Sequence, residues 1–135
     1  MEDNRKILLV EDDRDMTQVM TDILEQAGYR SIAVSDCESA YRALEKESPD
    51  LVLLDLVLPD GSGFEVCRRA ASGKEGIGCP VPVIILSAKS GLDCKIKSFM
   101  SGAVRYFTKP FDVEELIEAV SSVLANSRMP QTASA

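Results

Sequence analysis

The sequence of 135 residues contains no histidine, and its four cysteines include no C-x-x-C pair. Without histidine the chain lacks the commonest general base and transition-metal ligand, so any histidine chemistry must come from a partner. Scattered cysteines indicate neither a zinc knuckle nor a redox dithiol. We expect all four to be reduced, mostly buried thiols: Cys37, Cys67, Cys79 and Cys94.

Positive charge is also scarce, because 15 Lys and Arg face 22 Asp and Glu, for a net charge of -7. This balance opposes binding to nucleic acid by counterion release and adhesion to anionic membranes. The sequence has no apolar run of about 18 residues, and residues 1–4 lack the features of a signal peptide. We therefore expect a cytoplasmic chain with no direct nucleic-acid or membrane contact.

The length fits one domain, which can bury roughly two-thirds of its unfolded surface. Apolar residues make up 45% and charged residues 27%, the mix of an ordinary globular protein. The composition says little about function. The sequence has no internal repeat or boundary, and residues 127–135 are expected to be a polar tail or the start of a linker.

Five apolar runs are typical of buried parallel strands, at residues 6–10, 29–34, 51–54, 81–86 and 104–107. Helical patterns separate them, with weaker ones at residues 62–71 and 91–101. Two capping boxes, Ser35 with Glu38 and Asp112 with Glu115, mark helix starts. The order of elements predicts a three-layer α/β sandwich whose ligands bind at the carboxyl ends of the strands.

Three of the expected helices carry an apolar stripe, and one of them is the weaker helix at residues 91–101. The first stripe ends at Gly28, where a left-handed cap is wanted. Its residues are Met16, Val19, Met20, Ile23, Leu24 and Ala27; those of the helix at 91–101 are Ile96, Phe99 and Met100; those of the last helix are Leu116, Ile117, Val120, Val123 and Leu124.

Polar side chains follow the strands at one edge of the expected sheet: Glu11, Asp12, Asp55, Ser87 and Lys109. If the first and third strands are neighbours, three carboxylates crowd together, and each pair at 4 Å costs on the order of 4 kcal/mol. A cation relieves that repulsion. An all-oxygen ligand set without histidine or thiolate suits Mg²⁺ and leaves room for a phosphate oxygen.

Each of these residues also has a plainer interpretation. Glu11 and Asp12, with Asp13, could cap the first helix. Asp55 could start a turn, although a carboxylate that ends an apolar strand can also attack phosphorus. Lys109 could be solvated, and Ser87 could be an ordinary loop serine. The joint arrangement, rather than any one residue, favours a phosphoryl site.

Taken together, the motifs resemble the receiver domains of two-component response regulators over about residues 5–126. Each motif alone is weak, but four in this order and spacing are specific. They are residues 7–13 (ILLVEDD), 53–63 (LLDLVLPDGSG), 87–88 (SA) and 102–111, which contain GA and YFTKPF.

The resemblance implies a CheY-like, flavodoxin-like fold with strand order 2-1-3-4-5. It implies that Asp55 accepts the phosphoryl group and that Lys109 and Ser87 bind phosphoryl oxygens. The implied Mg²⁺ ligands are Glu11, Asp12, Asp55 and the backbone carbonyl of Val57. Tyr106 would be the switch aromatic beside Ser87, and the Lys109–Pro110 bond would be cis.

The resemblance also implies partners and an output. A sensor histidine kinase or histidine phosphotransfer protein would donate the phosphoryl group, and an effector domain or protein would receive the signal. The face made by the fourth helix, fifth strand and fifth helix would carry it, and is also compatible with a phosphorylation-dependent homodimer. The domain would be a signalling switch, enzymatic only toward its own phosphorylation and dephosphorylation.

Three residues depart from the common family pattern. Glu11 stands where aspartate is more usual, Ser87 where threonine is frequent, and Arg105 where an acid is often found. Val57 and Lys89 occupy positions that control water attack in this family, and Val57 cannot orient a water. We therefore expect slow self-dephosphorylation.

Charge is unevenly spread, since residues 89–110 hold five basic residues and one acid. This excess predicts an acidic partner surface or, more simply, a solvated helix face. The basic residues are Lys89, Lys95, Lys97, Arg105 and Lys109, and the acid is Asp93.

Other classes of protein fit less well. A phosphatase of the haloacid dehalogenase class needs a second aspartate where this chain has Val57. A flavodoxin needs a phosphate loop after the first strand, where acids stand instead. The alternative that remains is a receiver-like binding module that works without phosphorylation.

Overall fold

A computed structural model describes residues 5–128 of the chain. Five parallel strands form one sheet in the order β2-β1-β3-β6-β7. Counted along the chain, this is the predicted order 2-1-3-4-5, which is therefore confirmed. The strands are β1 (Lys6–Val10), β2 (Arg30–Val34), β3 (Leu51–Leu54), β6 (Val83–Ser87) and β7 (Arg105–Thr108).

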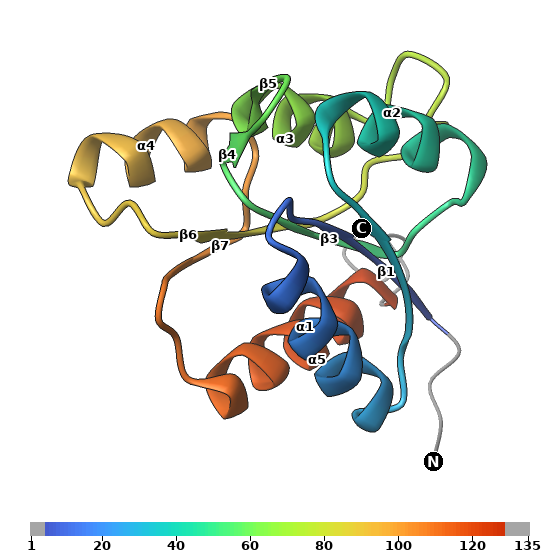
Figure 1. The fold of residues 1–135 in the computed structure, drawn as a ribbon. Coiled ribbons are helices and arrows are strands. Elements are labelled where there is room, and N and C mark those ends of the chain that lie inside the picture. Colours follow the sequence, from blue (N-terminus) through green and yellow to red (C-terminus); the bar gives the residue numbers. More distant parts are fainter. Residues whose placement is uncertain (1–4, 129–135) are drawn as a thin grey trace.

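Helices cover both faces of the sheet, so the predicted three-layer sandwich is confirmed (Figure 1). One face is covered by α1 (Arg14–Gln26) and α5 (Val113–Arg128). The other lies under α2 (Cys37–Lys46) and α3 (Gly63–Ser72), with α4 (Leu92–Met100) beside them near the β7 edge.

The central strands are buried on both faces, which explains why they read as apolar throughout. Successive side chains of a strand point to opposite faces. In β1, Leu8 and Val10 therefore join the core under α2 and α3, whereas Ile7 and Leu9 join the core under α1 and α5. All four residues of β3 are buried in the same alternating way.

Two expected helix signals and one expected cis peptide bond are confirmed. Gly28 has a φ of 95°, in the left-handed region. Oδ1 of Asp112 accepts hydrogen bonds from the backbone N–H groups of Glu114 and Glu115, at 2.8 and 3.2 Å. The Lys109–Pro110 bond is cis.

The expected cap of α2 was misplaced by one residue. Asp36, not Ser35, is the N-cap, and its Oδ1 accepts from the N–H of Ser39 at 2.8 Å. Either side chain can cap a helix, and the backbone of Asp36 is the one that is extended there.

Two of the expected apolar stripes also include residues that the structure leaves exposed. Val19 on α1 is 53% exposed, and the α4 residues Ile96, Phe99 and Met100 are 48, 49 and 83% exposed. In α4 the stripe faces outward because the helix lies at the edge of the layer and contacts chiefly α3 and β7. The cysteines are all free thiols, but only Cys37 and Cys67 are buried.

A short hairpin follows β3 that the sequence pattern did not predict. Its strands β4 (Val57–Leu58) and β5 (Gly61–Ser62) pair antiparallel. The expected tail begins inside α5, which includes residues 127 and 128, and its residues 129–135 lie outside the described part. Among residues 5–128, no helix combines the length and apolarity needed to cross a membrane.

Candidate functional site

Glu11, Asp55 and Lys109 stand one position beyond β1, β3 and β7 and are still held by the sheet, whereas Ser87, expected just past the fourth strand, is the last residue of β6. The N–H of Glu11 donates to the carbonyl of Val34 in β2 at 3.0 Å, and the N–H of Asp55 donates to that of Val10 in β1 at 3.0 Å. Likewise, the N–H of Lys109 donates to the carbonyl of Ser87 at 2.8 Å. These backbone hydrogen bonds between neighbouring strands therefore fix the positions of the Cα atoms from which the three side chains extend.

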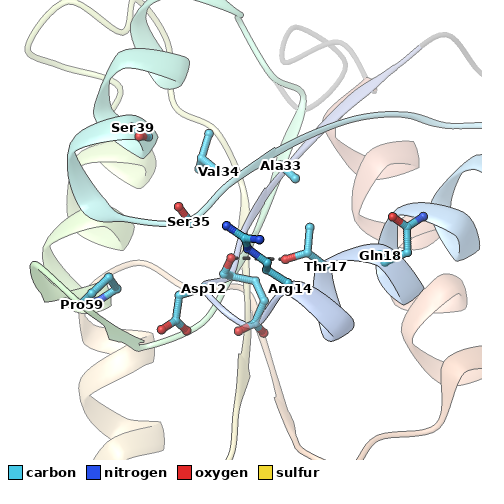
Figure 2. A pocket seen from close by; sticks show the side chains of 10 residues that line it. Asp12, Arg14, Thr17, Gln18, Ala33, Val34, Ser35, Ser39 and Pro59 are labelled. Atoms are coloured by element: carbon cyan, nitrogen blue, oxygen red, sulfur yellow. Dashed lines mark hydrogen bonds between the residues drawn. The ribbon is translucent and has the colours of Figure 1, made fainter.

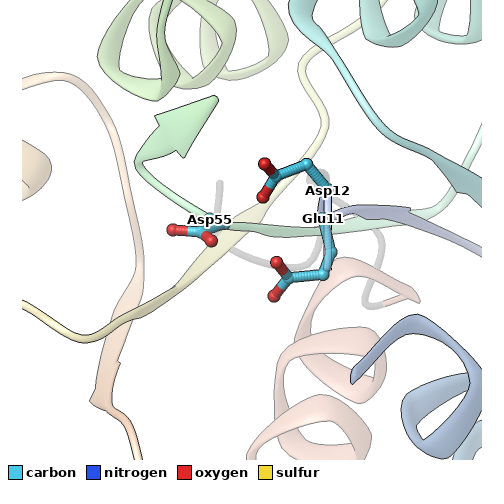
Figure 3. Close-up of side chains that lie close together, drawn as sticks. All are labelled: Glu11, Asp12 and Asp55. Carbon is cyan, nitrogen blue, oxygen red and sulfur yellow. The ribbon is translucent and has the colours of Figure 1, made fainter. Parts of the chain in front are cut away.

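Three carboxylates meet at this edge. One oxygen each from Glu11, Asp12 and Asp55 lies within 4.8 Å of the others, and Figure 3 shows the three carboxylate groups close together. The side chain of Glu11 is 3% exposed and that of Asp55 12%. Asp12 is exposed, so the group is open to solvent on that side.

Lys109 joins this acidic group. Its Nζ lies 2.6 Å from Oε1 of Glu11 and 3.4 Å from Oδ2 of Asp55. Burial raises the pKa of Glu11, and the hydrogen bond from Lys109 opposes that rise. Burial acts to lower the pKa of Lys109, but the bond with Glu11 and the charge of Asp55 outweigh it and raise that pKa. Lys109 is therefore cationic.

The donor set fits a magnesium ion. Three carboxylates face one ammonium group, which leaves negative charge that a divalent cation can offset. All the ligand atoms are oxygens, as Mg²⁺ prefers, and exposed Asp12 leaves space for the waters that Mg²⁺ retains.

Of the three acids that could cap the first helix, Asp13 is the one that does so. Its Oδ1 accepts hydrogen bonds from the N–H groups of Asp15 and Met16, at 2.9 and 3.1 Å. Glu11 instead points into the acidic group, where its Oε2 accepts from the N–H of Asp13 at 3.2 Å. The plain capping interpretation holds for Asp13 and leaves Glu11 and Asp12 for the candidate metal site.

Ser87 and Tyr106 form a second group, next to β6 and β7. Ser87 is fully buried, and its Oγ accepts from the N–H of Lys89 at 3.1 Å. Oη of Tyr106 donates to the backbone carbonyl of Lys89 at 2.5 Å. Burial, with the nearby thiol of Cys94, raises the pKa of Tyr106 to about 12. The two predicted switch residues therefore share one backbone partner, Lys89.

A cavity of about 690 Å³ opens beside the acidic group. Figure 2 shows side chains from the start of α1 and from the start of α2 on opposite sides of it. Its lining residues are Glu11, Asp12, Arg14, Thr17, Gln18, Ala33, Val34, Ser35, Ser39 and Pro59.

Two features near the site were missed from the sequence. Thr17 holds the start of α1, because its Oγ1 donates to the carbonyl of Asp13 at 2.9 Å. Asp60, in the turn of the new hairpin, accepts from the N–H of Cys37 at 2.7 Å. No local spacing signals the second contact, since 23 residues separate the partners.

Comparison with known proteins agrees with this geometry. Residues 7–121 match the family described as the response regulator receiver domain. The chain is 33% identical over 120 residues to the phosphate regulon transcriptional regulatory protein PhoB of Escherichia coli, covering 89% of this chain and 52% of that protein. It is 37% identical over 129 residues to the DNA-binding dual master transcriptional regulator RpaA of Synechocystis, covering 95% and 53%. It thus spans about half the length of these curated relatives.

A solved structure gives the same result. The CheY-like response regulator receiver domain protein of Methanospirillum hungatei superposes with a TM-score of 0.84 at 26% identity, covering 93% of this chain and 97% of that one. The family match extends over most of the chain, from β1 into α5. The chain therefore belongs to the receiver domains of two-component response regulators.

Proposed function

We propose that Asp55 is the phosphoacceptor of this receiver domain and that the reaction requires Mg²⁺. The observation that carries the proposal is the grouping of Asp55 with Glu11, Asp12 and the Lys109 ammonium group at one end of the sheet. We also propose that the domain spans residues 5–126 and acts in the cytoplasm.

Bound by Glu11, Asp12, Asp55 and the carbonyl of Val57, Mg²⁺ would offset the charge on the phosphoryl oxygens. An oxygen of Asp55 forms the new bond to phosphorus. The bond between phosphorus and the donor imidazole nitrogen breaks, its electron pair stays on that nitrogen, and no net oxidation occurs. Lys109 and Ser87 donate hydrogen bonds to the transferred group.

The domain catalyses only its own modification, so it is a switch rather than a conventional enzyme. Hydrolysis of the aspartyl phosphate needs a positioned water. Val57 is 56% exposed but has an apolar side chain that cannot hold one. We therefore propose a slow loss of the phosphoryl group.

The switch runs from Ser87 to the face formed by α4, β7 and α5. A phosphoryl group that recruits the Ser87 hydroxyl pulls on the β6–α4 loop, because Ser87 accepts from the N–H of Lys89. Tyr106 is bonded to the carbonyl of the same residue and follows the movement. The exposed apolar side chains of α4 supply a surface that can change partners.

The proposed partners are a sensor histidine kinase or histidine phosphotransfer protein as donor and an effector domain or protein as recipient. A homodimer formed through the α4–β7–α5 face is one form of the output. We propose no direct nucleic-acid contact by this chain, because its net charge is -7.

Binding of beryllofluoride, an aspartyl phosphate mimic, tests the proposal. In the presence of Mg²⁺, amide NMR signals of residues 87–89 and 106 should shift in the unsubstituted chain and stay unchanged in Asp55→Asn. If neither chain responds, the phosphorylation-independent binding module becomes the better account.

A further inference from the structure

The start of α2 is tied to the hairpin that follows Asp55. The two carboxylate oxygens of Asp60 accept hydrogen bonds from the N–H groups of Cys37 and Glu38, at 2.7 and 3.1 Å. Asp36 serves the next N–H, that of Ser39, at 2.8 Å. The carboxylates of Asp36 and Asp60 therefore accept hydrogen bonds from the free backbone N–H groups in the first turn of α2. Of the two, only Asp60 comes from another element.

Packing supports this link between α2 and the hairpin. Cys37 and Leu58 are 6% and 7% exposed and belong to the same core. The Sγ of Cys37 lies 3.9 Å from the carbonyl oxygen of Ser62. A Cβ atom at Gly61 would lie 3.3 Å from that sulfur, so the second strand of the hairpin rests against the first turn of the helix.

The other end of the hairpin is tied to Asp55. Oδ1 of Asp55 accepts from the N–H of Val57 at 3.1 Å, and the N–H of Gly63 donates to the carbonyl of Leu56 at 2.9 Å. A Cβ atom at Gly63 would lie 2.6 Å from the carbonyl oxygen of Asp55, so the backbone is tightly packed there. A displacement of the backbone at the turn of the hairpin would therefore also displace the backbone of Val57.

We propose that Asp60 is a positioning residue of the metal site. By clamping the hairpin to α2, it fixes the backbone of Val57, whose carbonyl is the one metal ligand that no side chain supplies. The inference rests on the proposed function of this site. Residues that orient metal ligands commonly change metal affinity by 10- to 100-fold when they are replaced.

Asp36 provides the matched control. It caps the same helix through a similar hydrogen bond, but among residues 5–128 its side chain forms no hydrogen bond or ion pair with the hairpin. Asp36→Ala and Asp60→Ala should both lower the unfolding temperature, since each removes a cap of α2. Only Asp60→Ala should weaken binding of Mg²⁺.

The experiment is a titration of the full chain with MgCl₂, followed by amide NMR signals. Asp60→Ala should raise the dissociation constant for Mg²⁺ on the order of 10-fold, and Asp36→Ala should leave it unchanged. Asp60→Asn keeps one acceptor oxygen, so its dissociation constant for Mg²⁺ should lie between those of Asp60→Ala and Asp36→Ala. In phosphorylation with acetyl phosphate, Asp60→Ala should need more Mg²⁺ for half the maximal rate but reach the normal rate at saturation.

If Asp60→Ala or Asp60→Asn folds and binds Mg²⁺ as tightly as the unsubstituted chain, Asp60 is only a helix cap and the inference is wrong. Asp60→Asn decides the question if Asp60→Ala does not fold. Asp55→Asn separates this failure from failure of the proposed function: if that variant also binds Mg²⁺ normally, the metal site itself is wrongly assigned.

Discussion

Nζ of Lys109 lies 2.6 Å from Oε1 of Glu11, nearer than it lies to Oδ2 of Asp55, at 3.4 Å. Glu11 is one methylene longer than the aspartate more usual at its position, and it makes this close contact while almost completely buried. Lys109 and a metal ion would therefore share the oxygens of Glu11. Charge balance at the site would then depend on both cations.

Lys109→Ala should make stability depend strongly on Mg²⁺. Without the ammonium group, Glu11 loses a charged hydrogen bond and the carboxylates repel one another, which should lower the free energy of unfolding by about 2 kcal/mol. Adding Mg²⁺ should recover much of that loss, as measured by urea unfolding with and without the metal.

Lys6→Ala is the control for this variant. The Nζ of Lys6 lies 3.5 Å from Oε1 of Glu47, in a more exposed ion pair away from the site. Such a pair contributes about 1 kcal/mol or less, and the change should not depend on Mg²⁺. A stability loss in Lys109→Ala that Mg²⁺ does not reduce would contradict the account of the charges.

Val57→Asn should shorten the lifetime of the phosphorylated form. The amide can orient an attacking water, which an isopropyl group cannot, and the expected acceleration is on the order of 10-fold. Loss of phosphate after removal of the donor measures it. An unchanged lifetime would mean that Val57 does not limit hydrolysis.

The clamp that Asp60 forms between the hairpin and α2, through the N–H groups of Cys37 and Glu38, should stabilise the fold less in acid. The hydrogen bonds from the N–H of Cys37 and Glu38 hold the pKa of Asp60 below its usual range. A carboxyl group with a lowered pKa stabilises the fold fully above its unfolded pKa, about 3.9, and loses that effect as the pH falls through the folded value.

The gap in unfolding temperature between the unsubstituted chain and Asp60→Ala should therefore be constant near neutrality and shrink below about pH 4. Thermal unfolding over a pH series measures it. A gap that stays the same in acid would show that the carboxylate charge has no part in the clamp.

Phe99→Asp should separate output from phosphorylation. Phe99 lies on the proposed output face and is 49% exposed, so a charge there should change stability little. Self-association induced by beryllofluoride should weaken about 10-fold, as measured by sedimentation, while phosphorylation stays normal. Val19→Asp, at a side chain of α1 that is 53% exposed, should leave self-association intact. Equal effects of the two changes would mean that α4 has no special role in self-association.

The sheet could be predicted from the sequence because buried parallel strands are apolar throughout, as in β3 and β6. The α4 stripe could not be placed correctly, because periodicity shows that Phe99 and Ile96 share a face but not whether anything covers it. The cap of α2 was missed by one residue because Ser35 and Asp36 are both good capping residues.

The acidic group could be predicted because parallel strands bring their carboxyl ends to one edge, so Glu11 and Asp55 must approach each other. The preference of Lys109 for Glu11 could not, since it depends on side-chain reach. The bond from Cys37 to Asp60 joins residues far apart in the chain, and only the folded backbone brings them together.

The most direct test of the central claim is the intact mass of the chain after incubation with Mg²⁺ and acetyl phosphate. We expect the mass of one added phosphoryl group, which should be absent in Asp55→Asn and absent when Mg²⁺ is removed. An unmodified mass, in a chain that also fails to bind beryllofluoride, would contradict the assignment of Asp55 as the phosphoacceptor.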